Sequence, residues 1–413
     1  MDMKSPKKLD WKQAISWALF DFANSSYALI IISFVFPIYF KEVIAPGPLS
    51  DLHWGLIVSI STLASAIFSP IVGAMADYDA KRKTKFITFT LVAIAGTAAL
   101  FLTGSDALLL AGSIFIITNL FYELAMVLYD SFLVTVSTEK TSGRISGLGY
   151  GLGYLGGIFA MLVLNPFFSS GYAGGLDSTY RLTFPLTALF FLLFALPAFI
   201  FIKEERTKGK SEPILNLFKI GFRNTLNTLK EIRKHKKIAW FMVALYFMHD
   251  GLTTIFVFIP IYLRNALLLN FSDIFTVFMI IQITGFPATF FFGWLSDKLG
   301  AKKILLSTIG IWILIVFLLS TTSSMAVVYV GAVLTGLVIG SSQAIARSWL
   351  SKIIPEEKRC EFFGFNAFAS KAAAVLGPVV FGTISSLASP RLAMFALIPF
   401  FVISFVIFCK IEE

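Results

Sequence analysis

The residues of this sequence that could do chemistry are a few ionisable side chains inside long apolar stretches. Asp21, Glu123, Asp250 and Lys371 each lie within a predominantly apolar run. An ionisable group at the centre of a bilayer costs at least about 2.5–3.5 kcal/mol, so such groups face a partner or a water-filled cavity. A carboxylate in that setting can bind and release a proton, and a lysine can hold an anion. The pattern therefore predicts ion and solute binding inside a membrane.

The composition of the chain excludes several classes of protein. Of its 413 residues, 57% are hydrophobic and 14% are charged, against about 45–50% and about 25% in a typical soluble domain. Two cysteines, Cys360 and Cys409, are too few for a disulfide scaffold or a cysteine-built zinc site. The high hydrophobicity excludes a disordered chain. We predict a membrane protein that crosses the bilayer many times and needs no metal and no cofactor.

Twelve stretches are long and apolar enough to be membrane-spanning helices. Such a helix needs about 20 predominantly apolar residues, whereas a barrel strand alternates over about 10. The predicted fold class is therefore an all-α membrane protein. We place the spans at residues 14–40, 54–76, 86–103, 108–131, 145–165, 182–202, 239–263, 272–296, 303–320, 325–349, 361–387 and 391–409.

The net charge of +10 is distributed between the spans. With the N-terminus inside, about 28 of the 34 Lys and Arg residues fall on the inner side, as the positive-inside rule requires. This placement argues against nucleic acid as a partner and puts both termini in the cytoplasm. The short loops are typical of a prokaryotic cell membrane, where we expect a monomer surrounded by membrane lipids.

The longest polar stretch divides the chain into two halves of six spans. We predict a bundle at residues 1–202, a cytoplasmic linker at 203–238 and a second bundle at 239–413. Apolar residues at helical spacing in the linker predict an amphipathic helix on the inner membrane surface, and a plain solvated linker is the alternative. These residues are Ile214, Leu217, Phe218, Phe222, Leu226, Leu229 and Ile232.

The two halves repeat each other at an offset of about 220 residues. Residues 36–41 match 259–264, and residues 73–83 match 293–303, each pair at the same span of its half. Six spans per half make this a parallel repeat. The repeat and its two Gly-x-x-x-Asp loops with basic residues resemble the major facilitator superfamily. The first loop departs from the superfamily pattern at Tyr78 and Ala80.

Three further segments are similar to a narrower family. They are the run from Trp17 to Ala28, the glycine-rich run at 142–157, and residues 340–348 followed by 361–365. They resemble the family that contains the autophagy-related vacuolar amino-acid effluxers of fungi, and the resemblance covers the whole chain. It implies a transporter of amino acids or similar metabolites with two six-helix bundles, and not an enzyme.

The resemblance also implies a gate on the inner side. In the superfamily the loop aspartates hold the halves closed through charge-assisted hydrogen bonds, which points to Asp77 and Asp297, with Arg82 among the basic residues. Asp130 and Arg347 are equivalent in the repeat, near the inner ends of spans four and ten. An ion pair between them would close the same gate, whereas the alternative is that both side chains snorkel to cytoplasmic water.

Substrate contacts are expected on the spans that line the central cavity of the superfamily. Lys371 could hold the carboxylate of an amino acid, and Gln343 lies in span ten. Asp21 and Asn24 are one helical turn apart and share a face of span one. We assign substrate binding to these four residues. The alternative for Asp21 is a structural hydrogen bond at the inner end of its helix, and the alternative for Lys371 is an internal salt bridge to Asp or Glu.

Proton coupling is assigned to three residues of spans four and seven, Glu123, Asp250 and the adjacent His249. Burial favours the protonated form of a carboxylate, and histidine titrates near neutral pH. Adjacent residues of a helix point about 100° apart, so only one of His249 and Asp250 need face a cavity. The alternative for each is a structural hydrogen bond.

Together these features predict a secondary active transporter. We expect it to move a small metabolite outward by alternating access, coupled to protons, because nothing in the chain resembles an ATP site. One rival is an exporter or flippase of amphipathic solutes such as drugs or lysolipids, which the 45 phenylalanines would suit. The other rival is a non-transporting receptor or scaffold on the same fold.

Two local patterns bear on helix packing. The G-x-G-x-x-G sequence at 151–156 follows no strand, so it does not predict a dinucleotide site. Gly149, Gly153 and Gly157 form a small-residue face that predicts close approach of another helix. Pro287, in the sequence Gly-Phe-Pro, predicts a break in span eight.

Overall fold

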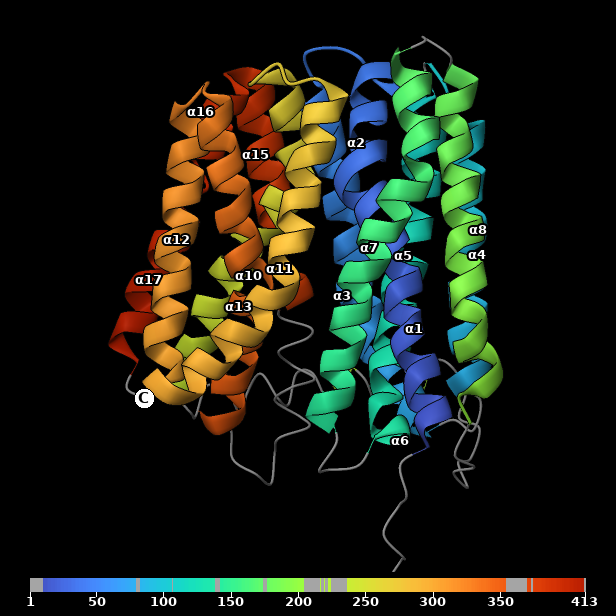
Figure 1. Cartoon of the computed structure of the whole chain (residues 1–413), viewed down its shortest axis with the longest axis vertical. Helices are drawn as coiled ribbons and strands as arrows, with labels where there is room; N and C mark the ends of the chain where they lie inside the picture. Colours follow the sequence, from blue (N-terminus) through green and yellow to red (C-terminus); the bar gives the residue numbers. More distant parts are fainter. Residues whose placement is uncertain are drawn as a thin grey trace, which may run out of the picture. The chain divides into compact units, whose positions relative to one another are not determined.

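The structure, a computed structural model, describes residues 10–78, 82–105, 107–137, 142–173, 177–203, 236–353, 370–372 and 374–411, together with 216, 219, 222 and 223. Every regular element among these residues is a helix (Figure 1). The main helices are α1 (Trp11–Tyr27), α2 (Val35–Tyr39), α3 (Ser50–Tyr78), α4 (Arg82–Ala99), α5 (Leu108–Ser131), α6 (Leu133–Val136), α7 (Ser142–Ala173), α8 (Asp177–Phe201), α10 (Lys236–Asn265), α11 (Phe271–Leu299), α12 (Ala301–Thr321), α13 (Met325–Ile353), α15 (Leu376–Leu387), α16 (Pro390–Phe395) and α17 (Ile398–Lys410).

Twelve helical stretches of the described chain are long and apolar enough to cross a membrane, which confirms the predicted number. The fourth span, Leu108–Ser131, has the predicted bounds, and most others differ by a few residues. The described part of the eleventh span begins at Ser370, and its predicted first part, residues 361–369, lies outside the described residues. Most of the predicted amphipathic linker helix lies outside them as well.

The first span is the least regular of the twelve. It runs over Trp11–Ile44, but the segments Ala28–Phe34 and Phe40–Ile44 are π-helical on either side of α2. A π-helical turn changes which face of the helix the following residues occupy. Such turns are frequent at functional sites. Within the first π-helical segment, span one also passes from one compact unit of the structure to the other, after Ile31.

Pro287 does not break its helix, so the predicted break in span eight is wrong. The helix α11 runs through Pro287 without interruption. Thr284 and Thr289 lie on either side, and their hydroxyls donate to the carbonyls of Ile280, at 2.6 Å, and Gly285, at 3.0 Å. Transmembrane helices tolerate proline where hydroxyl groups and neighbouring helices satisfy the backbone.

A different span, the eleventh, is interrupted. Ser370–Ala372 is helical, Ala374 and Val375 form a turn, and α15 starts at Leu376. The chain was predicted to form one continuous helix here. The interruption gives a new helix N-terminus inside a predicted membrane span, and Lys371 lies just before it.

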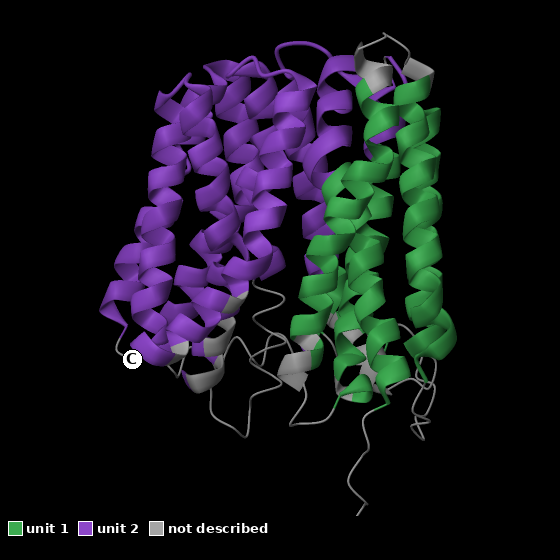
Figure 2. Ribbon diagram, in the orientation of Figure 1, with its two compact units in different colours: residues 1–31, 68–103, 113–222 green, residues 32–67, 104–112, 223–413 purple. Residues whose placement is uncertain are grey.

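The helices form two compact units, shown in different colours in Figure 2. Unit 1 comprises residues 1–31, 68–103 and 113–222, and unit 2 comprises residues 32–67, 104–112 and 223–413. Unit 2 therefore includes the second part of span one and most of span two. This grouping describes packing, and the division of the sequence into bundles at 1–202 and 239–413 stays a prediction.

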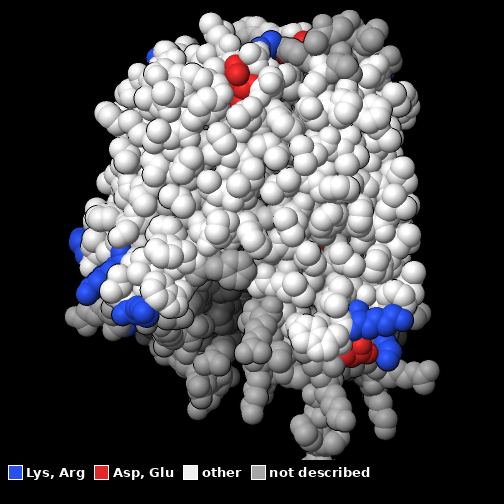
Figure 3. Space-filling view, viewed as in Figure 1, with Lys and Arg blue, Asp and Glu red and all other residues white. Residues whose placement is uncertain are grey.

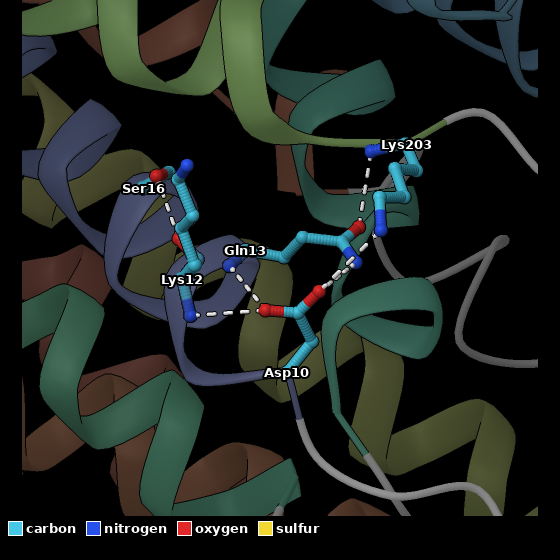
Figure 4. Close-up of polar contacts among 5 residues, drawn as sticks. All are labelled: Asp10, Lys12, Gln13, Ser16 and Lys203. Carbon is cyan, nitrogen blue, oxygen red and sulfur yellow. Dashed lines mark hydrogen bonds and ion pairs between the residues drawn. The ribbon is translucent and has the colours of Figure 1, made fainter.

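In unit 1, α1 begins at a capped N-terminus (Figure 4). The carboxylate of Asp10 accepts hydrogen bonds from the backbone N–H groups of Lys12, at 3.1 Å, and Gln13, at 3.3 Å. The Gln13 amide donates to Asp10 at 2.8 Å and accepts from the N–H of Lys203, just past α8, at 3.0 Å. The Gln13 side-chain hydrogen bond is the main reason that the pKa of Asp10 is lowered. This network fixes the start of α1 against the end of α8.

The charged side chains of the described residues lie mostly near the helix ends. On the face shown in Figure 3, the blue and red atoms gather toward the two ends, and the band between them is nearly free of charge. A lipid-facing surface has this character, because a charge there costs several kcal/mol. The few charged residues within the spans are therefore the candidates for a site.

Candidate functional site

In unit 1, the predicted site residue Asp21 lies at the junction of three helices. Its Oδ2 accepts a hydrogen bond from the Tyr129 hydroxyl of α5 at 2.8 Å, and its Oδ1 accepts one from the amide of Asn24 at 3.2 Å. On the α7 side stand Gly149 and Gly153. A Cβ atom at Gly149 would overlap Asp21 Oδ2, and one at Gly153 would lie 3.2 Å from Ser25 Oγ. Two members of the predicted small-residue face, Gly149 and Gly153, thus pack on α1 beside the carboxylate, and Gly156 packs on Phe22.

The tyrosine that binds Asp21 is itself held firmly. The rings of Trp17 and Tyr129 stack with centroids 4.6 Å apart and an interplanar angle of 8°. Trp17 Nε1 donates to the backbone carbonyl of Tyr129 at 3.0 Å, and the Tyr129 hydroxyl lies 3.2 Å from the backbone carbonyl of Trp17. Sequence reasoning missed both aromatic residues, since nothing in their spacing relates positions 112 residues apart.

Further along the same helices lies a second polar cluster, around Glu123. Tyr27 donates to Asn119 at 3.5 Å, and the Tyr27 and Tyr122 rings lie 4.4 Å apart. Both phenol groups interact electrostatically with Glu123, which is partly buried. The predicted proton-coupling residue is thus surrounded by hydrogen-bonding groups of α1 and α5.

In unit 2, Asp250 is fully buried in the middle of α10. Its Oδ1 accepts a hydrogen bond from the backbone N–H of Gly377, at the start of α15, at 2.8 Å. Its Oδ2 is buried and has no hydrogen-bond partner among the described residues. The Thr254 hydroxyl donates to the Asp250 carbonyl at 2.7 Å. A Cβ atom at Gly377 would overlap Thr254 Oγ1 and lie 2.7 Å from Asp250 Oδ1. Only a glycine fits here.

The remaining predicted substrate and proton residues of unit 2 are less enclosed. His249 and Lys371 are partly buried. Gln343 is exposed on α13, and its amide donates to the carbonyl of Ile339, one turn back on its own helix, at 3.4 Å. Among the predicted site residues of unit 2, the described contacts therefore place Asp250 in the most tightly packed polar site.

Unit 2 also contains a polar cluster that sequence reasoning missed, at the end of span one opposite the N-terminus. The buried carboxylate of Asp51 pairs with Lys41 Nζ and accepts a hydrogen bond from Ser385 Oγ of α15. The N–H of Leu52 donates to Ser386 Oγ at 3.1 Å. We call Lys41, Asp51, Leu52, Ser385 and Ser386 the α3–α15 clasp.

A second ion pair lies in the same part of unit 2. Arg264 Nε of α10 donates to Glu42 Oε1 at 2.7 Å. Lys41 and Arg264 occupy equivalent positions of the internal repeat. This match of two basic residues was a signal that could have pointed to both ion pairs.

The residues predicted for the inner gate are shown only in part. Arg82 donates to Thr135 Oγ1 at 2.7 Å, and its guanidinium lies over the Phe132 ring, so it binds the end of α5 and α6 in its own unit. Asp130 is exposed near the end of α5. The side chains of Asp77, Asp297 and Arg347 lie outside the described residues. The gate stays a prediction.

Comparisons with known proteins show which family, relatives and solved structures this chain is similar to. The sequence model of the family described as "Vacuole effluxer Atg22 like" matches residues 55–413. The chain is 30% identical to the uncharacterized MFS-type transporter YxiO of Bacillus subtilis over 97% of this chain and 95% of that protein. It is 24% identical to Autophagy-related protein 22 of Yarrowia lipolytica over 59% of this chain and 46% of that one. A solved D-xylose-proton symporter matches with a TM-score of 0.75 at 14% identity, covering 98% of both chains.

The fold and these likenesses define an integral, multi-pass membrane transporter with the major facilitator fold, and not an enzyme. Within that class, the chain belongs to the Atg22-like vacuole effluxer family. The expectations drawn from the resemblance are confirmed for fold and family. The receptor or scaffold rival is set aside, because the matched relatives are transporters.

Proposed function

We propose that this transporter exports a small metabolite, an amino acid or a similar solute, in exchange for protons. The cycle is alternating access to a binding site within the membrane. We place the protein in a prokaryotic cell membrane with both termini in the cytoplasm, as the distribution of Lys and Arg indicates. The description of its family as effluxers supports the outward direction.

The single observation that supports proton coupling is the buried environment of the Asp250 carboxylate. A buried carboxylate oxygen without a partner is costly while the group is ionised. Protonation of Oδ2 removes the charge and leaves the hydrogen bond from Gly377 to Oδ1 in place. Asp250 is therefore suited to be ionised at one stage of a transport cycle and protonated at another. Glu123 is the corresponding candidate in unit 1, and His249 is an accessory one.

The proposed anchor for the solute carboxylate is Lys371. It lies just before the interruption of the eleventh span and is partly buried. Transporters commonly bind solutes at discontinuous helices, whose exposed backbone groups and helix ends offer polar contacts inside the membrane. Gln343 and Asn24 stay predicted substrate contacts.

The test is transport by the full-length protein in liposomes, with labelled amino acids and with or without a pH gradient. We expect gradient-stimulated transport that is lost in Asp250→Asn and in Lys371→Ala. Asp273→Asn and Lys410→Ala remove the same charge types outside these sites and serve as matched controls. Gradient independence of the wild type, or full coupling in Asp250→Asn, would overturn the coupling proposal. Transport only of lysolipids or drugs would overturn the solute class.

A further inference from the structure

The Tyr129 hydroxyl in unit 1 lies between two acceptors, Asp21 Oδ2 at 2.8 Å and the backbone carbonyl of Trp17 at 3.2 Å. A phenolic hydroxyl has one proton, so it can donate to only one of them. If Asp21 is ionised, Tyr129 donates to the carboxylate. If Asp21 is protonated, its Oδ2–H donates to the Tyr129 oxygen, and Tyr129 donates to Trp17. Both contacts of the Tyr129 hydroxyl are hydrogen bonds only when Asp21 is protonated.

We propose that Asp21 is a further proton-binding site in unit 1, distinct from the candidate Glu123, and that Tyr129 switches its hydroxyl between the carboxylate and the Trp17 carbonyl. No bond other than an O–H bond changes: the proton arrives at Asp21 Oδ2 and later leaves it. This inference rests on the proposed proton coupling, and it gives Asp21 a role other than the predicted substrate contact. Asp250 belongs to unit 2 and titrates as a separate group.

The charges around Asp21 favour a bound proton. From α5, the Asp130 carboxylate interacts with Asp21 electrostatically, and a neighbouring like charge disfavours ionisation. Tyr122 of α5 also interacts with it. Among the described residues, Asp21 forms no ion pair with Lys or Arg. The Asn24 amide and the Tyr129 hydroxyl are its neutral hydrogen-bond partners.

The described side chains of the other helices packed on α1 form no ion pair with Asp21, and the side chain of Arg144 of α7 lies outside the described residues. Gly149 and Gly153 of α7 lie against this part of α1, and Tyr150 lies between them in sequence. The short α6 has no ionisable residue. On α8, Phe190 and Phe194 pack on Phe22, the neighbour of Asp21. The charged residues of α8, Asp177 and Arg181, and its one tyrosine, Tyr180, lie in its first two turns.

Close packing makes the switch selective for a proton. A Cβ atom at Gly149 would overlap Asp21 Oδ2, so α7 leaves no room for a larger ion beside that oxygen. Stacking on Trp17 and the bond from Trp17 Nε1 hold the tyrosine ring in place. The change therefore consists of moving hydrogen atoms and altering the attraction between α1 and α5.

The first test needs no transported solute. Infrared difference spectra of the reconstituted full chain, taken between acidic and alkaline buffer, report protonated carboxyl groups directly. We expect one carboxyl band to disappear in Asp21→Asn and to shift in Tyr129→Phe, which removes its hydrogen-bond partner. Loss of a different band in Asp250→Asn would show that the two sites titrate separately. A spectrum unchanged by Asp21→Asn would overturn the proposal, whatever the result for the solute.

The second test determines how many protons move per solute. This number is calculated from the pH gradient at which the net flux of the solute is zero. We expect this number to fall by one in Asp21→Asn, while Tyr129→Phe shifts the pH profile of transport and keeps the stoichiometry. Ser26→Ala is the control on α1, because its buried hydroxyl bonds only within its own helix, to Ala23. An unchanged stoichiometry in a well-folded Asp21→Asn protein contradicts a proton site, and leaves Asp21 a structural residue.

Discussion

At the residue scale, the buried carboxylate of Asp250 binds the backbone of a glycine on another helix. The carboxylate binds the N–H of Gly377, and that approach is close enough to exclude any side chain at position 377. The negative charge lies at the N-terminus of α15, where the helix dipole is favourable to it. Protonation of Asp250 weakens that attraction, so the state of one oxygen alters how firmly α15 is held.

Substitution of Gly377 by alanine tests this contact. The added Cβ would overlap Thr254 Oγ1, and we expect a loss of about 1–3 kcal/mol of stability, typical of overpacking, with loss of gradient-driven transport. Thermal unfolding in detergent and liposome flux measure the two effects. Gly310→Ala is the matched control, since a Cβ there meets nothing within 4 Å. Thr254→Ala in the Gly377→Ala background should restore part of the stability, and absence of rescue would contradict the packing argument.

The cap of α1 gives a second prediction at this scale. The bond from Gln13 is the main cause that lowers the pKa of Asp10. The stabilisation is therefore complete above the ordinary pKa of aspartate, about 4, and is lost as the pH falls through the lower pKa of the folded protein. We expect Asp10→Ala to lower the Tm at neutral pH and to match the wild type at strongly acidic pH. Asp10→Ser keeps a capping oxygen and should retain part of the effect at every pH.

At the element scale, α15 is a short helix held at both ends. Its first turn binds Asp250 of α10, and its last turn binds Asp51 and Leu52 of α3 through the clasp. Near the clasp, a Cβ atom at Gly382 would lie 3.1 Å from Leu52 Cα, so α3 and α15 are in close backbone contact. We expect a helix of 12 residues tied in this way to move as one body, so that a change at one end reaches the other.

Hydrogen exchange tests this linkage. We expect Ser385→Ala to weaken the clasp by about 1–3 kcal/mol, because Asp51 loses a donor in a buried place, and to raise deuterium uptake in both α15 and the first turns of α3. Ser404→Ala also removes a buried hydroxyl that donates to a backbone carbonyl, that of Ala244 at 2.9 Å, and serves as control. Equal uptake in the two variants would mean that the clasp does not hold α15.

At the scale of the whole molecule, orientation in the membrane follows from the loops. The outer segments contain few basic residues, and the ion pairs Lys41–Asp51 and Glu42–Arg264 neutralise two of them within unit 2. The N-terminus, the C-terminus and the linker at 203–238 are then all expected on the cytoplasmic face.

Labelling with a membrane-impermeant maleimide checks the orientation. Cys409 is exposed near the C-terminus, and it should react in inside-out vesicles but not in intact cells. A cysteine placed at exposed Leu49 in a Cys360→Ser, Cys409→Ser background should behave in the opposite way. Permeabilised cells give the total reactivity of each protein. Reaction of Cys409 in intact cells would reverse the proposed topology and, with it, the direction of export.

How much was predictable from the sequence differs between the fold and the site. The number of spans was predictable, because the bilayer imposes length and hydrophobicity on each span separately. The family was predictable from the resemblance of its motifs. Asp21, Glu123 and Asp250 were found by the same rule, since charge inside a span is conspicuous. The prediction of a break at Pro287 was wrong, because a transmembrane helix can continue through a proline where it packs among other helices.

The sequence by itself determined that this is a twelve-span transporter of the Atg22-like family, and which spans contain the costly charges. Only the tertiary structure decided the partners: Tyr129 for Asp21, Gly377 for Asp250, and Ser385 for Asp51. These pairs join positions more than 100 residues apart. Hydrophobicity is a property of each segment, whereas a hydrogen bond depends on distance and direction, which arise only when the helices pack.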